Sequence, residues 1–189
     1  MKVSKTPLSD VLLIETDLLR DSRGHFAESW NAIRYEGVGI SGKFVQDNFS
    51  VSRRGVLRGL HFQCPHPQDK LVQVLQGAVF DAIVDLRKGS PTFGKWWGTE
   101  LTEENGRQLF VPIGFAHGFQ AVREDSVLVY ICSEFYHPES ERTILWNDSD
   151  LGISWPIENP IFSPKDSLGL SLSEWLKRPE SAAFGFEHP

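Results

Sequence analysis

Short apolar or alternating runs recur along most of the chain, and turn-forming residues separate many of them. The runs cover residues 11–14, 44–51, 56–62, 71–75, 78–86, 107–111, 115–122, 126–135 and 142–146. Alternating runs of this length are typical of half-buried β-strands, and the Gly- and Pro-containing segments between them are turn signals. Helical patterns are confined to residues 31–36 and 172–178, the second with Ser171 or Ser173 as a candidate N-cap. The sequence therefore predicts a mainly β protein, a jelly-roll sandwich or barrel with a few short helices.

The composition of the 189 residues fits a single soluble globular domain, because 40% are hydrophobic and 12% aromatic, too many for a disordered chain. No apolar run approaches the roughly 20 residues of a membrane helix, and the N-terminal segment lacks the pattern of a signal peptide. Cys64 and Cys132 form neither a CxxC pair nor a disulfide framework, so we expect a reducing, cytoplasmic location. A net charge of -6 without a basic block argues against nucleic-acid and membrane partners.

Alternation within two of the runs indicates which side chains share a face of a strand. In one run Asp81 and Asp85 fall on the same face, opposite an apolar face that we expect to pack against the core. The face with the carboxylates either meets solvent or lines a polar cavity. In another run strict alternation places Arg58 and His61 on opposite faces, but Gly59 between them permits a β-bulge that re-aims one side chain.

Two segments carry Gly, Pro and His at a spacing that resembles the two motifs of the cupin superfamily, which are small double-stranded β-helix barrels. The segments are Gly55-Val-Leu-Arg-Gly-Leu-His61-Phe-Gln63, continuing to Lys70 and Gly77, and Gly106-Arg-Gln-Leu-Phe-Val-Pro112-Ile-Gly114-Phe-Ala-His117. Metal-binding cupins supply three His and one Glu from these motifs. His61 and His117 match two of these positions, but Gln63 stands at another His position and Lys70 where the Glu is expected. Because an ammonium group among the ligands would repel a cation, we predict an acid–base site and no metal.

Seven stretches along the chain resemble, in this order, the dTDP-4-dehydrorhamnose 3,5-epimerase family. They read FVQDN from Phe44, GVLRGLHFQ from Gly55, VFDAIVDLR from Val79, SPTFG from Ser90, PIGFAHGF from Pro112, WND from Trp146 and ISWP from Ile153. The resemblance covers most of the chain, from about Asp21 to Asp166. It implies one cupin-type domain over residues 1–189. Strands and a dimer-contacting arm are expected in 1–50, the barrel core in 51–146, and a helix and tail in 165–189.

The resemblance also implies a reaction. The family's substrate is dTDP-4-dehydro-6-deoxy-D-glucose, whose C4 ketone acidifies the hydrogens on C3 and C5. Inversion of both carbons gives dTDP-4-dehydro-L-rhamnose, a step of dTDP-L-rhamnose biosynthesis. Each inversion needs a base on one face of the sugar, an acid on the opposite face, and a group that stabilises the enolate between them. No redox or metal cofactor is needed.

By the same resemblance, four residues fill these roles. His61 is the base, since an imidazole with a pKa of about 6.5 is largely neutral at cytoplasmic pH, and Asp166 orients its ring. Tyr130 is the acid, and Lys70 stabilises the C4 oxygen, with His117 as a second candidate. Each assignment has a purely structural alternative. His61 and His117 could be buried histidines whose nitrogens are hydrogen-bonded within the core, and Asp166 could cap a turn or helix in a polar loop. Tyr130 could be an ordinary core aromatic, and Lys70 an exposed side chain at the start of a strand.

A further set of residues matches the positions with which the family binds the nucleotide and the sugar. They are Arg23, Glu28, Gln46, Asp47, Asn48, Arg58, His117, Tyr136, Glu141 and Lys165. The guanidinium groups suit a diphosphate because each can bind two oxygens at once, and Tyr136 fits a stacking role against thymine. The segment of Arg23 reaches into the neighbouring subunit's site in the family, which implies a homodimer. Taken singly, each charged residue could equally be a solvated surface side chain.

Departures from the family and competing functions remain open. Asp69 stands where the family has a small residue, and Asp81 is a candidate ion-pair partner of Lys70. The chain could invert only C3 or only C5 of a related 4-keto nucleotide sugar. It could also be a metal-dependent cupin oxygenase or isomerase, which Gln63 and Lys70 disfavour, or a sugar-binding jelly roll without enzymatic activity.

Overall fold

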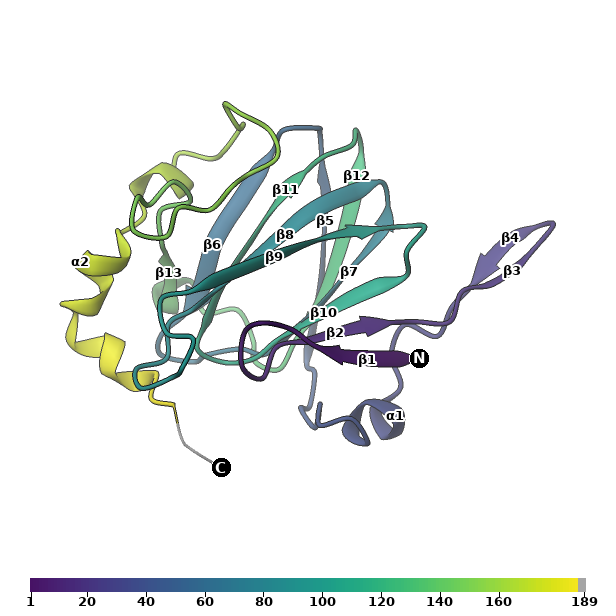
Figure 1. Ribbon diagram of the computed structural model, residues 1–189, viewed down its shortest axis with the longest axis horizontal. Helices are drawn as coiled ribbons and strands as arrows, with labels where there is room; N and C mark the ends of the chain where they lie inside the picture. Colours follow the sequence, from purple (N-terminus) through teal and green to yellow (C-terminus); the bar gives the residue numbers. More distant parts are fainter. Residues whose placement is uncertain (187–189) are drawn as a thin grey trace.

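Two antiparallel β-sheets packed face to face form the body of the computed structural model, which describes residues 1–186 (Figure 1). The six-stranded sheet has the order β1 (Lys2–Lys5), β2 (Leu12–Glu15), β10 (Arg107–Val111), β7 (Lys70–Gln76), β12 (Ser126–Cys132) and β5 (Gln46–Ser52). The five-stranded sheet has the order β13 (Glu141–Thr143), β6 (Leu57–Gln63), β11 (Phe115–Ala121), β8 (Ala78–Asp85) and β9 (Trp96–Thr102). This arrangement confirms the predicted mainly β, jelly-roll architecture.

Elements outside the two sheets are short. A hairpin of β3 (Leu19–Asp21) and β4 (Gly24–Phe26) projects from the body as an arm (Figure 1). The helices are α1 (Ala32–Glu36) and α2 (Leu172–Leu176), and three short 3-10 helices cover Pro138–Ser140, Asp166–Leu168 and Pro179–Ala183. Both predicted helices are confirmed, and the Ser171 hydroxyl caps α2 through a capping box with Glu174. No helix among residues 1–186 is long and apolar enough to cross a membrane.

The core lies between the sheets and is continued by a second layer outside the smaller sheet. Apolar side chains of both sheets, such as Val72 and Ile83, meet in the first cluster. Val84 belongs to a second cluster with Trp175 of α2, so both faces of β8 are buried. The face of β8 that carries Asp81 and Asp85 was expected either to meet solvent or to line a polar cavity. The first expectation is wrong, because Asp81 is fully buried.

The predicted strand pattern differs from the structure at four places, each with a local cause. β1 was not predicted because Val3 is the single apolar residue among its four. β9 was not predicted because adjacent tryptophans and Gly98 break its alternation; the Phe80 ring occupies the space that a side chain at Gly98 would need. The arm hairpin has no apolar alternation, and its strands are fully exposed. Of the run over 142–146, only Arg142 and Thr143 lie in a strand, the three-residue β13, which pairs with the end of β6.

The predicted bulge in β6 is present and decides which side chains reach the interior. The pairing of β6 with β11 shifts register between His117 and Phe119, and Gly59 has a φ of +136°. Because the alternation is interrupted there, Arg58 and His61 line the same pocket. Gly59 also lies directly against β11: a Cβ on it would be 2.4 Å from the Cα of Gly118.

We therefore predict that Gly59→Ala lowers the free energy of unfolding by on the order of 2 kcal/mol or more, because neither the positive φ nor the backbone contact tolerates a methyl group. Denaturant unfolding measures the change. Gly185→Ala is the matched control, since a Cβ at Gly185 would meet no atom within 4 Å. Equal stability losses in the two variants would contradict the explanation.

Candidate active site

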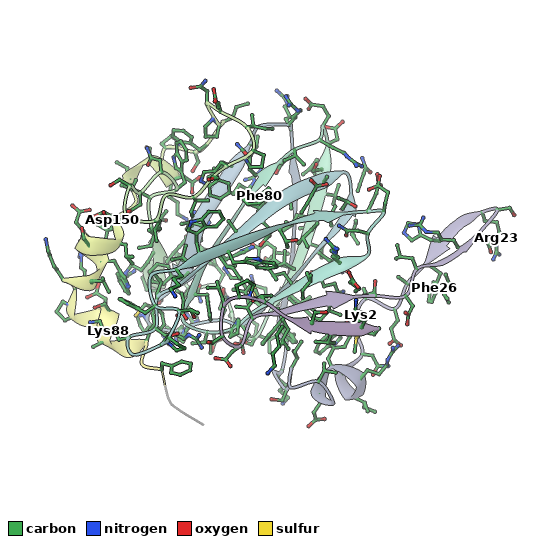
Figure 2. The ribbon with its side chains drawn as sticks, viewed as in Figure 1. Lys2, Arg23, Phe26, Phe80, Lys88 and Asp150 are labelled. Atoms are coloured by element: carbon green, nitrogen blue, oxygen red, sulfur yellow. The ribbon has the colours of Figure 1, made fainter. Side chains whose placement is uncertain are left out.

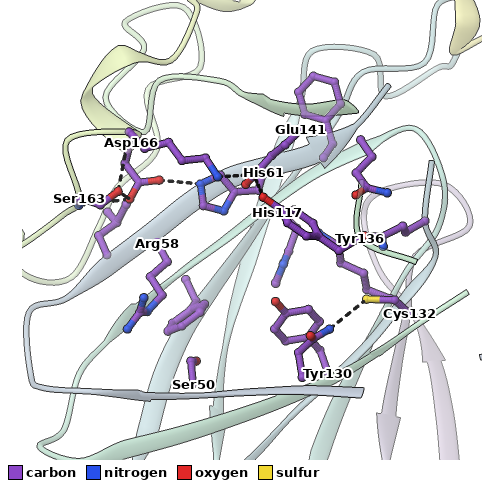
Figure 3. Close-up of a pocket in the computed structure, with 18 of the residues that line it drawn as sticks. Ser50, Arg58, His61, His117, Tyr130, Cys132, Tyr136, Glu141, Ser163 and Asp166 are labelled. Atoms are coloured by element: carbon purple, nitrogen blue, oxygen red, sulfur yellow. Dashed lines mark hydrogen bonds and ion pairs between the residues drawn. The ribbon is translucent and has the colours of Figure 1, made fainter. Parts of the chain in front are cut away.

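A pocket of about 640 Å³ opens between the two sheets and the segment that precedes the 3-10 helix at Asp166 (Figure 3). Eleven of the predicted site residues line it: Gln46, Asn48, Arg58, His61, Lys70, His117, Tyr130, Tyr136, Glu141, Lys165 and Asp166. Residues 157–166 run along the start of β6 as a C-terminal strap. The amide of Leu57 donates to the carbonyl of Ile161, whose own amide donates to the carbonyl of Gly55.

The strap brings Asp166 to His61 across 105 positions of sequence. The Nε2 of His61 lies 2.6 Å from Oδ1 of Asp166, whose side chain is only 4% exposed. Oδ2 of Asp166 accepts a hydrogen bond of 2.7 Å from the hydroxyl of Ser163. Burial alone would raise the pKa of Asp166, but the hydrogen bonds from His61 and Ser163 outweigh it and hold the pKa below its usual value. The carboxylate is therefore ionised at neutral pH and can stabilise an imidazolium.

The hydrogen bond to Asp166 also determines which nitrogen of His61 can act on a ligand. Nε2–H donates to the carboxylate, which leaves Nδ1 unprotonated in the neutral ring. Nδ1 has no hydrogen-bond partner within residues 1–186, and His61 lines the pocket. The dyad thus presents a proton acceptor with a fixed orientation to whatever occupies the cavity.

Tyr130 and Lys70 enter the same pocket from the six-stranded sheet, whereas His61 enters from the five-stranded one. Figure 3 shows Tyr130 and His61 on different sides of the pocket. Burial raises the pKa of the Tyr130 hydroxyl, so it remains a proton donor at neutral pH. The ammonium of Lys70 lies 6.0 Å from the centre of the Tyr130 ring, and burial lowers its pKa despite the nearby acidic groups.

The expected pairing of Lys70 with Asp81 is wrong. Asp81 instead binds His117, whose Nε2 lies 3.0 and 2.9 Å from its two carboxylate oxygens. Both side chains are buried, and β11 places His117 directly opposite His61 of β6. Because Lys70 forms no ion pair with any residue in 1–186, its charge is available to a ligand.

β5 supplies one polar side of the pocket by simple alternation. Gln46 and Asn48 face the pocket, as does Ser50, whose buried hydroxyl has no partner within residues 1–186. Asp47 points the other way and is exposed, so the structure does not bring it to this chain's pocket, contrary to the expectation. Ser50 was not predicted as a site residue, although the same alternation from Gln46 onward places it on the pocket face.

A polar cluster joins the β12–β13 connection to the strap at the edge of the pocket. The hydroxyl of Tyr136 donates to Glu141 at 2.6 Å, and the ammonium of Lys165 forms an ion pair with the same carboxylate. Burial raises the pKa of Glu141, but these two partners outweigh it and lower the pKa overall. The hydrogen bond to Glu141 raises the pKa of Tyr136 to about 12. Nearby, Nε of Arg58 donates to the hydroxyl of Ser52 at 3.2 Å.

Arg23 and Glu28 lie away from this pocket. Arg23 is at the exposed tip of the arm, where it pairs with Asp21 (Figure 2). Glu28 binds Arg34 and Asn31 near the base of the arm. A second chain would be needed for either residue to complete a site of this kind.

The unusual Asp69 does not face the pocket. Its carboxylate accepts a hydrogen bond of 2.9 Å from the amide of Ile113, and its own amide donates to the Ser133 hydroxyl. Burial raises the pKa of Asp69. Ser163 was not predicted as a site residue, although a serine three residues before an aspartate is a common capping arrangement. Among residues 1–186, no group of three or more His, Cys, Asp or Glu side chains is placed to hold a metal ion.

Comparisons with known proteins identify one family, by sequence and by fold. A family model described as dTDP-4-dehydrorhamnose 3,5-epimerase matches residues 5–174. The dTDP-4-dehydrorhamnose 3,5-epimerase of Shigella flexneri is 50% identical over 171 residues, 89% of this chain and 94% of that protein. The corresponding enzyme of Methanothermobacter thermautotrophicus is 49% identical over 165 residues, 86% and 89% of the two chains.

A solved structure extends the likeness over the full chain. The dTDP-6-deoxy-D-glucose-3,5-epimerase of Legionella pneumophila, in complex with dTDP-4-keto-L-rhamnose, superposes with a TM-score of 0.93 at 45% identity. The match covers 100% of this chain and 99% of that one. A more distant relative, the dTDP-4-dehydrorhamnose 3-epimerase of Streptomyces niveus, is 39% identical over 92% of this chain and 85% of its own.

Proposed function

The chain belongs to the dTDP-4-dehydrorhamnose 3,5-epimerase family, and we propose that it inverts C3 and C5 of dTDP-4-dehydro-6-deoxy-D-glucose to give dTDP-4-dehydro-L-rhamnose. The observation that carries this proposal is the His61–Asp166 dyad in a pocket that also holds an unpaired lysine and a protonated tyrosine. The enzyme is an isomerase of the carbohydrate-epimerase class. Its reaction would belong to dTDP-L-rhamnose biosynthesis in the cytoplasm, where the two free thiols remain reduced.

Each inversion follows from the positions of these groups. Nδ1 of His61 takes the proton from C3 or C5, and the electrons of the broken C–H bond form the enolate, with the negative charge on the C4 oxygen. The ammonium of Lys70 stabilises that oxygen, because a desolvated cation interacts with developing charge far more strongly than it would in water. The hydroxyl of Tyr130 returns a proton to the opposite face and regains one from solvent, and the imidazolium of His61 releases its proton to solvent before the next inversion. Asp166 holds the imidazole in its reactive tautomer throughout.

The remaining polar residues would hold the nucleotide. Arg58 suits the diphosphate, Gln46 and Asn48 offer amide groups from β5, and the ring of Tyr136 can stack on the base. We further propose that the chain forms a homodimer in which Arg23 and Glu28 of the arm contribute to the partner's site. Light scattering measures the oligomeric state, and Arg23→Ala would weaken substrate binding without changing turnover at saturation.

Incubation with the 4-keto sugar nucleotide in D2O tests the proposed reaction. Deuterium incorporated at both C3 and C5 supports the double epimerase. A second candidate, inversion of a single carbon, is favoured by the likeness to the 3-epimerase of Streptomyces niveus, and it would give deuterium at one carbon only. No incorporation at either carbon would refute both.

Activity is expected to survive exhaustive treatment with EDTA, because Gln63 and Lys70 occupy two positions that metal-binding cupins use for ligands. Added zinc, iron or manganese should not raise the rate. Turnover measured before and after chelation gives the comparison. Loss of activity on chelation with recovery on adding one of these metals would revive the metal-dependent alternative.

Tyr130→Phe should slow inversion by roughly tenfold or more while exchange with solvent falls much less. The ring keeps its packing, and His61 can still remove a proton and return a deuteron to the original face. The decisive quantity is the ratio of deuterium uptake to inverted product in D2O, which should rise above the wild-type ratio. A folded variant that inverts at the wild-type rate would show that the hydroxyl has a structural role only.

A further inference from the structure

Gln63 is a pocket residue to which the proposed reaction assigns no role. It ends β6 two positions after His61 and is 4% exposed. Its Nε2 donates to the carbonyl of His66 at 2.7 Å and to the carbonyl of Phe135 at 3.1 Å. Its Oε1 accepts from the amide of His137 at 2.7 Å. The His137 amide needs an acceptor, so the orientation of the side-chain amide is fixed and both of its N–H donors are used.

These bonds join two loops that are far apart in sequence. The first follows β6 at residues 64–69, and the second is the 134–137 turn, which follows β12 and carries Tyr136. Other glutamines hold the same turn by its backbone. The amide of Tyr136 donates to Oε1 of Gln46 at 2.8 Å, and Nε2 of Gln68 donates to the carbonyl of Glu134 at 2.6 Å.

The result is a turn whose main chain is fixed while the ring of Tyr136 stays half exposed at the pocket. Tyr136 is half exposed, lines the pocket and contacts the rest of the protein through its hydroxyl, which donates to Glu141. A flexible turn would have to be ordered each time a ligand stacked on that ring, and this ordering would weaken binding. Fixing the backbone in advance removes that cost.

We propose that Gln63 is a positioning residue for nucleotide binding, acting by holding the 134–137 turn so that the Tyr136 ring meets the base of the ligand. This inference rests on the proposed function, because it takes the occupant of that part of the pocket to be a nucleotide. Gln63 does not act on the sugar, since its amide group is fully committed to backbone partners. Its loss should therefore change affinity and leave the chemistry of bound substrate largely intact.

The test compares Gln63→Met with Gln120→Met. Both glutamines are buried on neighbouring strands, and Gln120 also binds loop backbone through both ends of its amide, at the carbonyl and amide of Ile157. We expect Gln63→Met to weaken dTDP binding, measured by calorimetry, by about tenfold and to raise KM similarly, with kcat within about threefold. Gln120→Met should reduce stability by a similar amount without weakening dTDP. Equal affinities of the two variants, or a fall in kcat without a change in KM, would overturn the proposal.

A double-mutant cycle shows whether Gln63 acts through Tyr136. In the Tyr136→Ala background, Gln63→Met should cost little further affinity for dTDP, whereas additive losses would contradict the proposed route. If Gln63→Met fails to fold, Gln63→Asn shortens the side chain by one methylene and breaks the same contacts.

Amide hydrogen exchange separates a failure of this inference from a failure of the proposed function. Exchange at Tyr136 and His137 should accelerate in the Gln63 variant whether or not the protein binds dTDP. Unchanged exchange would refute the positioning role. If exchange is faster in the Gln63 variant but the wild-type protein binds no dTDP, the positioning role stands and the assignment of a nucleotide to the pocket is refuted.

Discussion

Replacing His61 with asparagine is expected to reduce turnover by about 10³-fold or more and to abolish deuterium exchange at C3 and C5 together. Asp166 orients His61 in the pocket, and Nδ1 of His61 is the atom that would remove both protons. Asparagine offers no proton acceptor of comparable basicity. Because the nucleotide contacts lie on other residues, affinity for dTDP should change far less than turnover.

For His61→Asn, the turnover and the deuterium exchange at C3 and C5 are both measured in D2O at saturating substrate. His66→Asn is a matched control, since its side chain is exposed and lies outside the pocket. That variant should retain wild-type turnover within about twofold. Near-normal exchange at either carbon in His61→Asn would remove His61 from that half of the reaction.

Replacing Lys70 with methionine should move activity and stability in opposite directions. Turnover is expected to fall by about 10²- to 10³-fold, because the C4 oxygen loses the cation that stabilises it. The free energy of unfolding should rise by on the order of 1 kcal/mol, because methionine fills a similar volume without a desolvated charge that has no ion-pair partner.

The pH dependence of stability gives an independent check on Lys70. Burial lowers the pKa of Lys70 in the folded protein, so the unfolded chain binds more protons between that pKa and the ordinary lysine value. Stability of the wild type should therefore increase with pH across this window, and the increase should be smaller in Lys70→Met. Lys95→Met, at an exposed position, should leave the profile unchanged. A Lys70→Met protein that is less stable than the wild type would contradict this account.

Local rules that connect residue order to side-chain direction explain where several of the site residues point. Alternation along β5 accounts for Gln46 and Asn48 facing the pocket, and it also explains why Asp47 does not. Gly59 signalled the bulge that lets Arg58 and His61 share one pocket. In each case the direction of a side chain is set by residues only two or three positions away in the sequence.

Partners that are set by tertiary packing were harder to predict. Asp81 had two cationic candidates within reach of the same cavity, and only the register of β11 against β8 assigns it to His117. The contact between His61 and Asp166 depends on the path of the strap and follows from no spacing rule. Arg23 lies at the exposed tip of the arm and pairs with Asp21, two residues away, so the role proposed for it depends on a second subunit.

The C-terminal strap places Asp166, half of the His61–Asp166 dyad, on a segment with little buried surface. Ile161 is 59% exposed and Phe162 is 39% exposed, so the strap contributes few apolar contacts to the body. Segments of this kind open at lower free energy than the strands of a core. Mild heating or denaturant should consequently inactivate the protein while the sheets are still folded. During synthesis, the strands of the barrel would likewise fold before the site is complete. The dyad forms only after the strap has left the ribosome and packed along β6.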